Sequence, residues 1–158
     1  MEMKYSEDTL QGWCQPASDT EEIKINNAIN MIKDAISRSE ELTDLDIEVF
    51  VQGSYANNTN VRTNSDVDVC IMLRSTVFTE YVDGLTDADY SFTEGTITYS
   101  DFKDRIIRAL QSKFGNANLV FGNKSIKIRS NSYHVDADAV ITFQFRNYKS
   151  IGSRNAQQ

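Results

Sequence analysis

The feature that most constrains this chain is a pair of short motifs joined by a polar stretch. The first motif, Gly53-Ser54, ends the apolar run 47–51, and the second, Asp66-Val67-Asp68, opens the apolar run 67–73. Glycine and clustered polar residues are typical of turns and loops, so the two runs are predicted to be strands with a loop over 60–65 between them. A glycine turn beside paired carboxylates indicates a site for phosphate and metal.

The paired carboxylates have a defined geometry if residues 67–73 form a strand. Alternate side chains share one face of a strand, so Asp66 and Asp68 point the same way, and the apolar residues between and after them point into a core. Two carboxylates on one face repel each other unless a cation lies between them. Mg²⁺ is commonly held by one or two carboxylates while substrate phosphates and water complete its coordination.

The glycine motif supplies a complementary phosphate site. Gly53 lacks a Cβ atom, which allows backbone N–H groups to approach a phosphate closely. Ser54 adds a hydroxyl donor at the expected start of a helical turn, where free N–H groups favour anions.

A further pair of carboxylates occurs late in the chain. Phosphoryl transfer with two metal ions usually requires one more carboxylate to bind the second ion and polarise the attacking hydroxyl. In the alternating run 135–143, Asp136 and Asp138 share one face and the apolar residues share the other. A sheet that places this run beside residues 66–73 would bring three or four acids together.

These motifs resemble those of a known family. Gly53-Ser54 followed by Asp66-x-Asp68 is similar to the signature of the DNA polymerase beta-like nucleotidyltransferases. Its wider setting, residues 52–62 and 65–69, resembles the bacterial CD-NTases, which are cyclic-oligonucleotide synthases related to cyclic GMP-AMP synthase and oligoadenylate synthase. The lead-in from Trp13 to Glu21 and the run 137–148 are also similar to CD-NTases. Ile141 and Thr142 depart from that pattern, where the family often has proline and alanine.

The resemblance implies a set of site residues. Asp66, Asp68 and Asp138 are the expected catalytic residues and ligands of two Mg²⁺ or Mn²⁺ ions, with Asp136 in reserve. The expected nucleotide-binding residues are Gln52, Gly53, Ser54, Asn57 and Ser65. The implied reaction joins ribonucleoside triphosphates into a cyclic di- or oligonucleotide second messenger of the anti-phage signalling type and releases pyrophosphate.

The rest of the pattern predicts an α/β (α+β) fold of the nucleotidyltransferase type. Helices are expected over 21–39 and 102–114, the second capped by Ser100 or Asp101 and ended by Gly115. Strands are expected over 118–121 and 124–129, and the stretch around 81–90 is expected to be an acidic loop. The twisted, mixed sheet would carry the acids on one face and the helices on the other.

We divide the chain into a catalytic core, residues 1–146, and a polar tail, residues 147–158. CD-NTases continue with a helical half that forms the second wall of the nucleotide cleft, and we expect this half to be absent. A protein partner or a dimer is then expected to cover the open cleft, because exposed apolar surface favours association.

Composition limits the partners. The formal net charge of −7 argues against binding to long nucleic acids, which depends on Lys and Arg, and favours small nucleotides that bring their own Mg²⁺. We expect no membrane contact and a cytoplasmic location, since no apolar stretch approaches a membrane span and the two cysteines are widely separated.

Several interpretations stay open at this stage. Lys124 and Lys127 either lie near the phosphates or occupy outward-facing positions of a strand, and the sequence favours neither. Asn57 either forms a turn or contacts the substrate. His134 is expected to be structural or solvated, because metal and carboxylate chemistry needs no imidazole. The alternative functions are nucleotidyl transfer to a protein or small-molecule hydroxyl, and a truncated, non-catalytic nucleotide-binding module.

Overall fold

A computed structural model describes residues 6, 18–53, 66–81 and 84–148 of the chain. It contains two long helices, α2 (Asp19–Ser37) and α4 (Tyr99–Phe114). Three short 3₁₀ helices accompany them: η1 (Glu40–Leu42), η2 (Asp87–Tyr90) and η3 (Asn116–Asn118). Among the described residues, no helix is both long and apolar enough to cross a membrane.

The strands form one mixed sheet in the order β1-β2-β5-β4-β3. Their bounds are Ile47–Gln52 for β1, Val67–Tyr81 for β2, Leu119–Phe121 for β3, Ile126–Ile128 for β4 and Ala137–Tyr148 for β5. Only the β2–β5 pair is parallel, and the other three pairs are antiparallel. The predicted pairing of the two acidic strands is confirmed.

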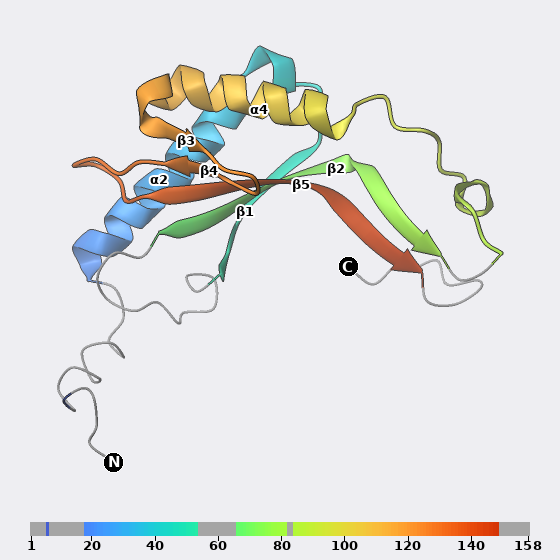
Figure 1. The fold of residues 1–158 in the computed structure, drawn as a ribbon, viewed down its shortest axis with the longest axis horizontal. Helices are drawn as coiled ribbons and strands as arrows, with labels where there is room; N and C mark the ends of the chain where they lie inside the picture. Colours follow the sequence, from blue (N-terminus) through green and yellow to red (C-terminus); the bar gives the residue numbers. More distant parts are fainter. Residues whose placement is uncertain (1–5, 7–17, 54–65, 82–83, 149–158) are drawn as a thin grey trace.

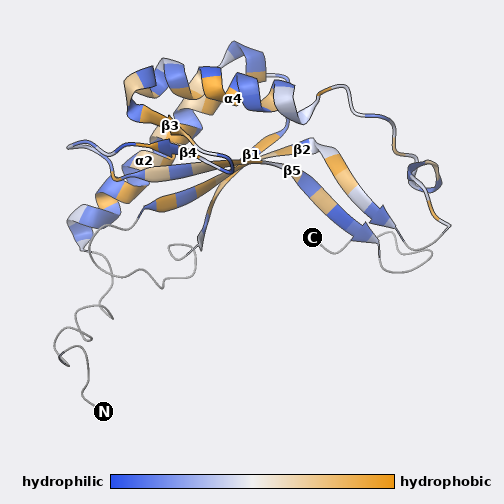
Figure 2. Ribbon diagram, in the orientation of Figure 1, coloured by the Kyte–Doolittle hydropathy of each residue, from blue (hydrophilic) through white to orange (hydrophobic). Residues whose placement is uncertain are grey.

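Both long helices cover the same face of this sheet (Figure 1). Helix α2 packs on β2, α4 packs on β5, and the two helices contact each other. Figure 2 shows hydrophobic and hydrophilic residues alternating along the helices and strands, as expected for elements with one buried face. The expected α+β class with helices on one side of a mixed sheet is therefore confirmed.

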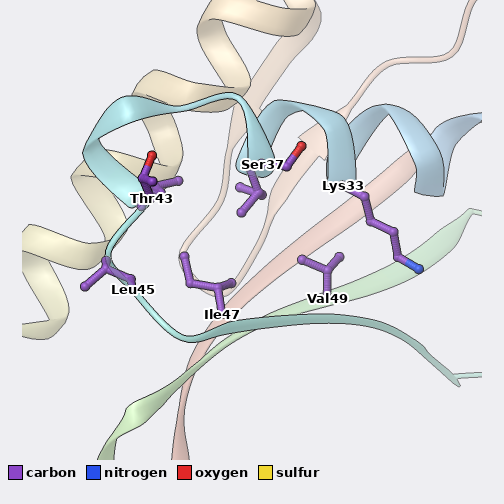
Figure 3. A pocket seen from close by; sticks show the side chains of 8 residues that line it. Lys33, Ser37, Thr43, Leu45, Ile47 and Val49 are labelled. Atoms are coloured by element: carbon purple, nitrogen blue, oxygen red, sulfur yellow. The ribbon is translucent and has the colours of Figure 1, made fainter.

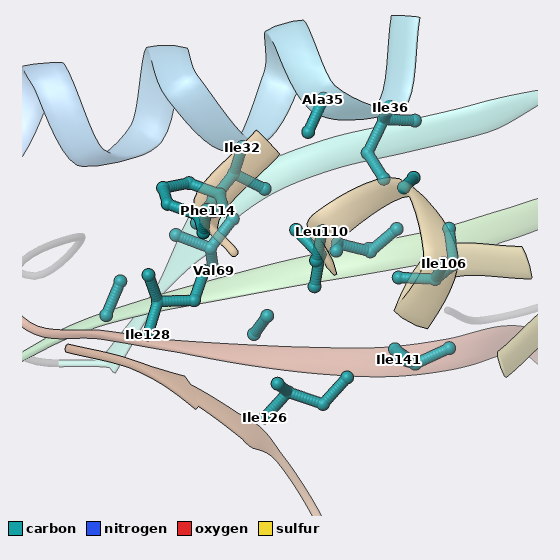
Figure 4. Packing of buried hydrophobic residues seen from close by; sticks show 14 of the residues in the cluster. Ile32, Ala35, Ile36, Val69, Ile106, Leu110, Phe114, Ile126, Ile128 and Ile141 are labelled. Carbon is teal, nitrogen blue, oxygen red and sulfur yellow. The ribbon is translucent and has the colours of Figure 1, made fainter. Parts of the chain in front are cut away.

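The core lies between the helices and the sheet (Figure 4). It is built from buried side chains of α2, α4 and four strands, among them Ile32, Ile36, Val69, Ile106, Leu110, Phe114, Ile126, Ile128 and Ile141. Burial of branched and aromatic side chains at about 25 cal/mol per Å² is the main force that holds this layer together. The opposite face of the sheet has no described helix on it.

The helix boundaries agree with the expected ones except at the start of α4. Ser18 caps α2, accepting a hydrogen bond from the Glu21 N–H. Helix α4 begins at Tyr99, because the Thr98 side chain accepts a hydrogen bond from the Asp101 N–H at 3.1 Å. The prediction of Ser100 or Asp101 as the cap was wrong, since both lie inside the first turn.

Strand β2 is much longer than the predicted run 67–73. It continues to Tyr81, so the prediction of a loop around residue 81 was wrong at its start. A register shift between Leu73 and Val77 interrupts the pairing with β5, after which the two strands pair again as far as Tyr81 and Tyr148. Strand β5 thus ends at Tyr148, whereas we place the start of the polar tail at Asn147. Beyond the shift, the β2–β5 pair projects past the helices (Figure 1).

Candidate active site

A row of polar side chains crosses the helix-free face of the sheet at one end of β2 and β5. In the strand register, Gln52 of β1 lies opposite Asp68 of β2, Asp68 opposite Asp138 of β5, and Asp138 opposite Lys127 of β4. Residues paired directly across strands point to the same face. Four strands therefore contribute one residue each to a single line of polar groups.

The buried neighbours of these residues explain why they face outward. Val67 and Val69 flank Asp68, and Ala137 and Ala139 flank Asp138; all four are at most 1% exposed and belong to the core. Since side chains alternate along a strand, burying these small apolar residues under the helices fixes both carboxylates on the other face. The fold of the apolar layer thus positions the acids.

Gly53 brings the end of β1 directly against Asp68. Its φ of +71° lies in the left-handed region, and a Cβ atom there would overlap the Asp68 Oδ2 atom and lie 3.3 Å from its Cγ. Only glycine combines this backbone conformation with such a close approach. We assigned Gly53 to phosphate binding, and the structure shows that it also defines the space for the Asp68 carboxylate. Ser54, Asn57 and Ser65 lie outside the described residues.

The Asp68 carboxylate lies in surroundings that disfavour its charged form. Burial raises its pKa above the ordinary value, and repulsion from the carboxylates of Asp138 and Asp66 raises it further. Within the described residues, no hydrogen bond or ion pair compensates the Asp68 carboxylate. Asp138 has one such partner, since the Ser125 hydroxyl donates to its Oδ1 atom at 3.3 Å. An unpaired carboxylate that is crowded by others is stabilised by a cation.

The donor set fits Mg²⁺ or Mn²⁺ in its chemistry. Asp66, Asp68 and Asp138 offer only carboxylate oxygens, the ligands that hard divalent cations prefer. In the conformation described here, however, no three His, Cys, Asp or Glu side chains of the described residues lie together as a metal-binding group. Asp66 instead contacts Lys127. The assignment of these three residues as metal ligands therefore stays a prediction.

Lys127 and Asp136 form an ion-paired group beside the row. The Lys127 Nζ atom lies 2.7 Å from the Asp66 Oδ2 atom and 3.1 Å from the Asp136 Oδ2 atom. The Ser130 N–H donates to Asp136 Oδ1 at 2.5 Å. Burial acts to raise the pKa of Asp136, but the Ser130 N–H and Lys127 outweigh it and the pKa lies below its usual value. Asp136 thus already has two partners, and its reserve role as a metal ligand stays a prediction.

Comparisons with known proteins show which family the chain matches. Residues 29–115 match the model of the nucleotidyltransferase domain family. The chain is 39% identical over 150 residues to a cyclic dipyrimidine nucleotide synthase CdnE of Cecembia lonarensis, covering 95% of this chain. It is 44% identical over 144 residues to the synthase of the same name from Legionella pneumophila, covering 90% of this chain. This chain belongs to the nucleotidyltransferase domain family.

A solved CD-NTase structure confirms the fold. The Rhodothermus marinus CdnE c-UMP-AMP synthase with Apcpp and Upnpp superposes with a TM-score of 0.79 at 27% identity over 96% of this chain. This chain spans about half the length of its relatives: 51% of the Cecembia protein, 49% of the Legionella protein and 50% of the Rhodothermus chain. The match to the family model includes Asp66 and Asp68 and ends before Asp138, so the place of the third carboxylate comes from the strand register.

His134 is a buried, packed residue. Its side chain is 2% exposed, its Nδ1 atom lies 2.8 Å from the Val135 carbonyl oxygen, and its ring packs edge-on against Phe114. The structural interpretation of this histidine is confirmed.

Sequence reasoning left the role of Lys127 open and missed Ser125. Alternation between buried Ile126 and Ile128 puts Lys127 on the outward face, but its contacts with the acids depend on β4 lying beside β5. No local signal gives that pairing. Lys124, the other candidate, lies exposed in the turn that precedes β4.

A pocket of about 380 Å³ lies elsewhere, between α2, η1 and β1 (Figure 3). Ile47 and Val49 of β1 line it together with Ile36 and Leu42. These strand positions face the helices, whereas Gln52 faces the carboxylates. The pocket is therefore on the other side of the sheet from the candidate active site.

Proposed function

We propose that this chain is the catalytic half of a synthase that joins ribonucleoside triphosphates into a cyclic di- or oligonucleotide. A ribose hydroxyl attacks the α-phosphorus of a triphosphate, the bond to the bridging oxygen of the β-phosphate breaks, pyrophosphate leaves, and the hydroxyl proton passes to solvent. The observation that carries the proposal is the pairing of Asp68 with Asp138 on the helix-free face of the sheet. The relatives, named as cyclic nucleotide synthases, support the product class.

In this proposal each residue of the row has a defined task. Asp66 and Asp68 would hold one Mg²⁺ or Mn²⁺ ion, and Asp138 would complete the site of a second. Such ions would neutralise phosphate charge and lower the pKa of the attacking hydroxyl. Gly53 keeps the Asp68 carboxylate in place, and its backbone, with Ser54, faces the β- and γ-phosphates. Gln52 stands at the β1 end of the row, where an amide can donate to the triphosphate.

The second wall of the nucleotide cleft is proposed to come from a partner, a second copy or the rest of a longer protein. Phe78 and Phe145 support this, since they pair across β2 and β5 and are 57% and 51% exposed. The role in anti-phage signalling and the cytoplasmic location are carried over from the family resemblance alone and stay predictions.

The test is product formation by the purified chain. It would be incubated with each α-labelled ribonucleoside triphosphate and Mg²⁺ or Mn²⁺, then treated with phosphatase, which leaves a cyclic product labelled. Asp68→Asn is expected to abolish the resistant label, whereas Asp44→Asn, the same change at an exposed position, is expected to retain it. Equal product from wild type and Asp68→Asn would contradict the proposal.

Two other outcomes separate the alternatives. Label that appears on a protein or a small molecule would favour the alternative in which the enzyme transfers a nucleotidyl group to a hydroxyl of that molecule. Metal-dependent triphosphate binding without any product would favour a half that needs its second wall, or a non-catalytic binding module.

A further inference from the structure

The Lys127 ammonium occupies the place where a cation is expected among the site's carboxylates. It projects from the middle of β4 onto the face that carries Asp68 and Asp138, directly opposite Asp138 in the register. Its closest partner is Asp66, at 2.7 Å, and Asp136 is the second, at 3.1 Å. Lys127 is 39% exposed at its side chain, so solvent and ions reach it.

The contacts of Lys127 form a chain that is anchored in the backbone. The Ser130 N–H fixes the Asp136 carboxylate, Asp136 orients the ammonium, and the ammonium holds Asp66. Asp66 is the residue immediately before β2, and Lys127 is the only described residue to which its carboxylate is ion-paired. The orientation of the Asp66 carboxylate therefore depends on Lys127.

In this arrangement one of the three proposed metal ligands is already paired with a cation. Asp66 contacts Lys127, while Asp68 has no hydrogen-bond or ion-pair partner among the described residues and lies opposite Asp138 in the register. No group of three ligands is formed among the described side chains. A divalent ion that binds Asp66 competes with the Lys127 ammonium for the charge of that carboxylate.

We propose that Lys127 is a positioning residue that holds Asp66 when no metal is bound and competes with the divalent ion for that carboxylate. The inference rests on the proposed function, because it takes Asp66 as a metal ligand. Lys127 thus stabilises the metal-free protein and weakens metal binding. Asp136 has the opposite effect on binding, because it draws the ammonium away from Asp66.

The two effects predict changes of opposite sign in Mn²⁺ affinity. Lys127→Met removes the competitor and is expected to tighten Mn²⁺ binding about fivefold, the size of effect typical of a partly exposed ion pair. Asp136→Asn leaves the ammonium to Asp66 alone and is expected to weaken Mn²⁺ binding about two- to threefold. In metal-free buffer, Lys127→Met is expected to lower the Tm by about 2–4 °C, and saturating Mn²⁺ is expected to remove that difference.

The experiment titrates the metal-stripped chain with Mn²⁺ alone by calorimetry and follows thermal unfolding with and without Mn²⁺. Lys124→Met is the matched control, because it removes the same charge from an exposed position just before β4. It is expected to leave the Mn²⁺ affinity within about twofold of wild type, since the charge of an exposed lysine is screened by water and salt. Lys127→Arg, which keeps the charge, is expected to bind Mn²⁺ like wild type or more weakly.

The outcomes separate this inference from the proposed function. Equal Mn²⁺ affinity in wild type and Lys127→Met, or an equal gain in Lys124→Met, would overturn the inference while the metal site stands. If Lys127→Met does not fold, the Mn²⁺ affinity of Asp136→Asn tests the inference instead. Mn²⁺ binding by Asp136→Asn that is equal to or tighter than that of wild type would overturn the inference. A wild-type chain whose Mn²⁺ binding is absent, or survives unchanged in Asp68→Asn, would overturn the metal site and the inference together.

Discussion

Replacing Gly53 with alanine tests whether the glycine motif positions the Asp68 carboxylate. The substitution has two effects, which the structure separates. A non-glycine residue at a φ of +71° is strained by about 1–2 kcal/mol, and the new Cβ atom meets Asp68 at its Oδ2 and Cγ atoms. Because a carboxylate at the end of a side chain can rotate away, the contact adds little to the loss of stability. The contact does displace the Asp68 carboxylate, which the proposed function makes a metal ligand.

Gly84→Ala provides the control for the backbone strain. Gly84 has a similar φ of +88°, and no atom lies within 4 Å of the Cβ position. We therefore expect Gly53→Ala and Gly84→Ala to lower the free energy of unfolding by similar amounts, about 1–2 kcal/mol each. Only Gly53→Ala is expected to reduce nucleotidyl transfer, by about 100-fold, since misplacing a catalytic group by about 1 Å costs that much.

Two measurements decide the Gly53 prediction. Urea unfolding followed by circular dichroism gives the stability of both variants, and the phosphatase-resistance assay gives their activity. Activity of Gly53→Ala close to that of wild type would refute the reasoning. A loss of activity of the same size in Gly84→Ala would show that backbone strain, and not the contact with Asp68, explains the effect.

Three further predictions concern stability and its pH dependence. Thr98→Ala is expected to lower the free energy of unfolding by about 1 kcal/mol through loss of the α4 cap, whereas Ser100→Ala is expected to change it by less than about 0.5 kcal/mol. Equal losses of stability in the two variants, measured by urea unfolding, would contradict the assignment of Thr98 as the cap. Phe102→Ala, at a residue that is 0% exposed, is expected to cost about 3–5 kcal/mol by the same measurement, and a cost below about 1 kcal/mol would contradict its place in the core. The third prediction uses the pKa of Asp68, which burial and the neighbouring carboxylates raise above its ordinary 3.8. In metal-free buffer the folded state favours the protonated form of Asp68, so the free energy of unfolding of the wild type is expected to fall relative to that of Asp68→Asn as the pH rises from about 4 to 7. Urea unfolding of both proteins at the two pH values measures this difference. A difference that does not change with pH would refute the prediction.

The carboxylate side of the site was predictable from the sequence because it depends on strand alternation. Val67 to Leu73 alternate between core and open face, as does the run from Ala137, and each pattern fixes its acids on one side. The sequence indicated that the two acidic runs would bring three or four acids together if they lay side by side, and the structure pairs them. It gave neither the parallel direction nor the register, and the choice of Asp138 over Asp136 came from the resemblance to CD-NTases.

The second half of β2 was missed because the alternation is interrupted there. Between Leu73 and Val77 the pairing with β5 shifts, so the face to which successive side chains point changes partway along the strand. A pattern of period two cannot be followed through such a shift. Phe78, a large apolar residue, is exposed in this segment, so apolar residues here do not mark a buried face of the strand.

The contacts of Lys127 were out of reach for a related reason. Its two ion-pair partners lie on different segments, Asp66 before β2 and Asp136 before β5, and they meet only in the folded sheet. Similarly, the Thr98 cap competes with Ser100 and Asp101, all three of which are good capping residues. Choosing among them requires knowing where the buried stripe of α4 first contacts the sheet.

The order of the strands has a consequence for how the protein acquires its site during synthesis. Strand β5 is the last element in the described chain, yet it lies in the centre of the sheet, between β2 and β4. Until it is added, β1–β2 and β3–β4 are separate hairpins, and Asp68 has neither Asp138 nor the β4 lysine beside it. Closing a parallel pair over so long a connection is slow compared with forming local hairpins and helices. A nascent chain therefore cannot assemble the acidic row before residues 137–139, which pair with both β2 and β4, have left the ribosome.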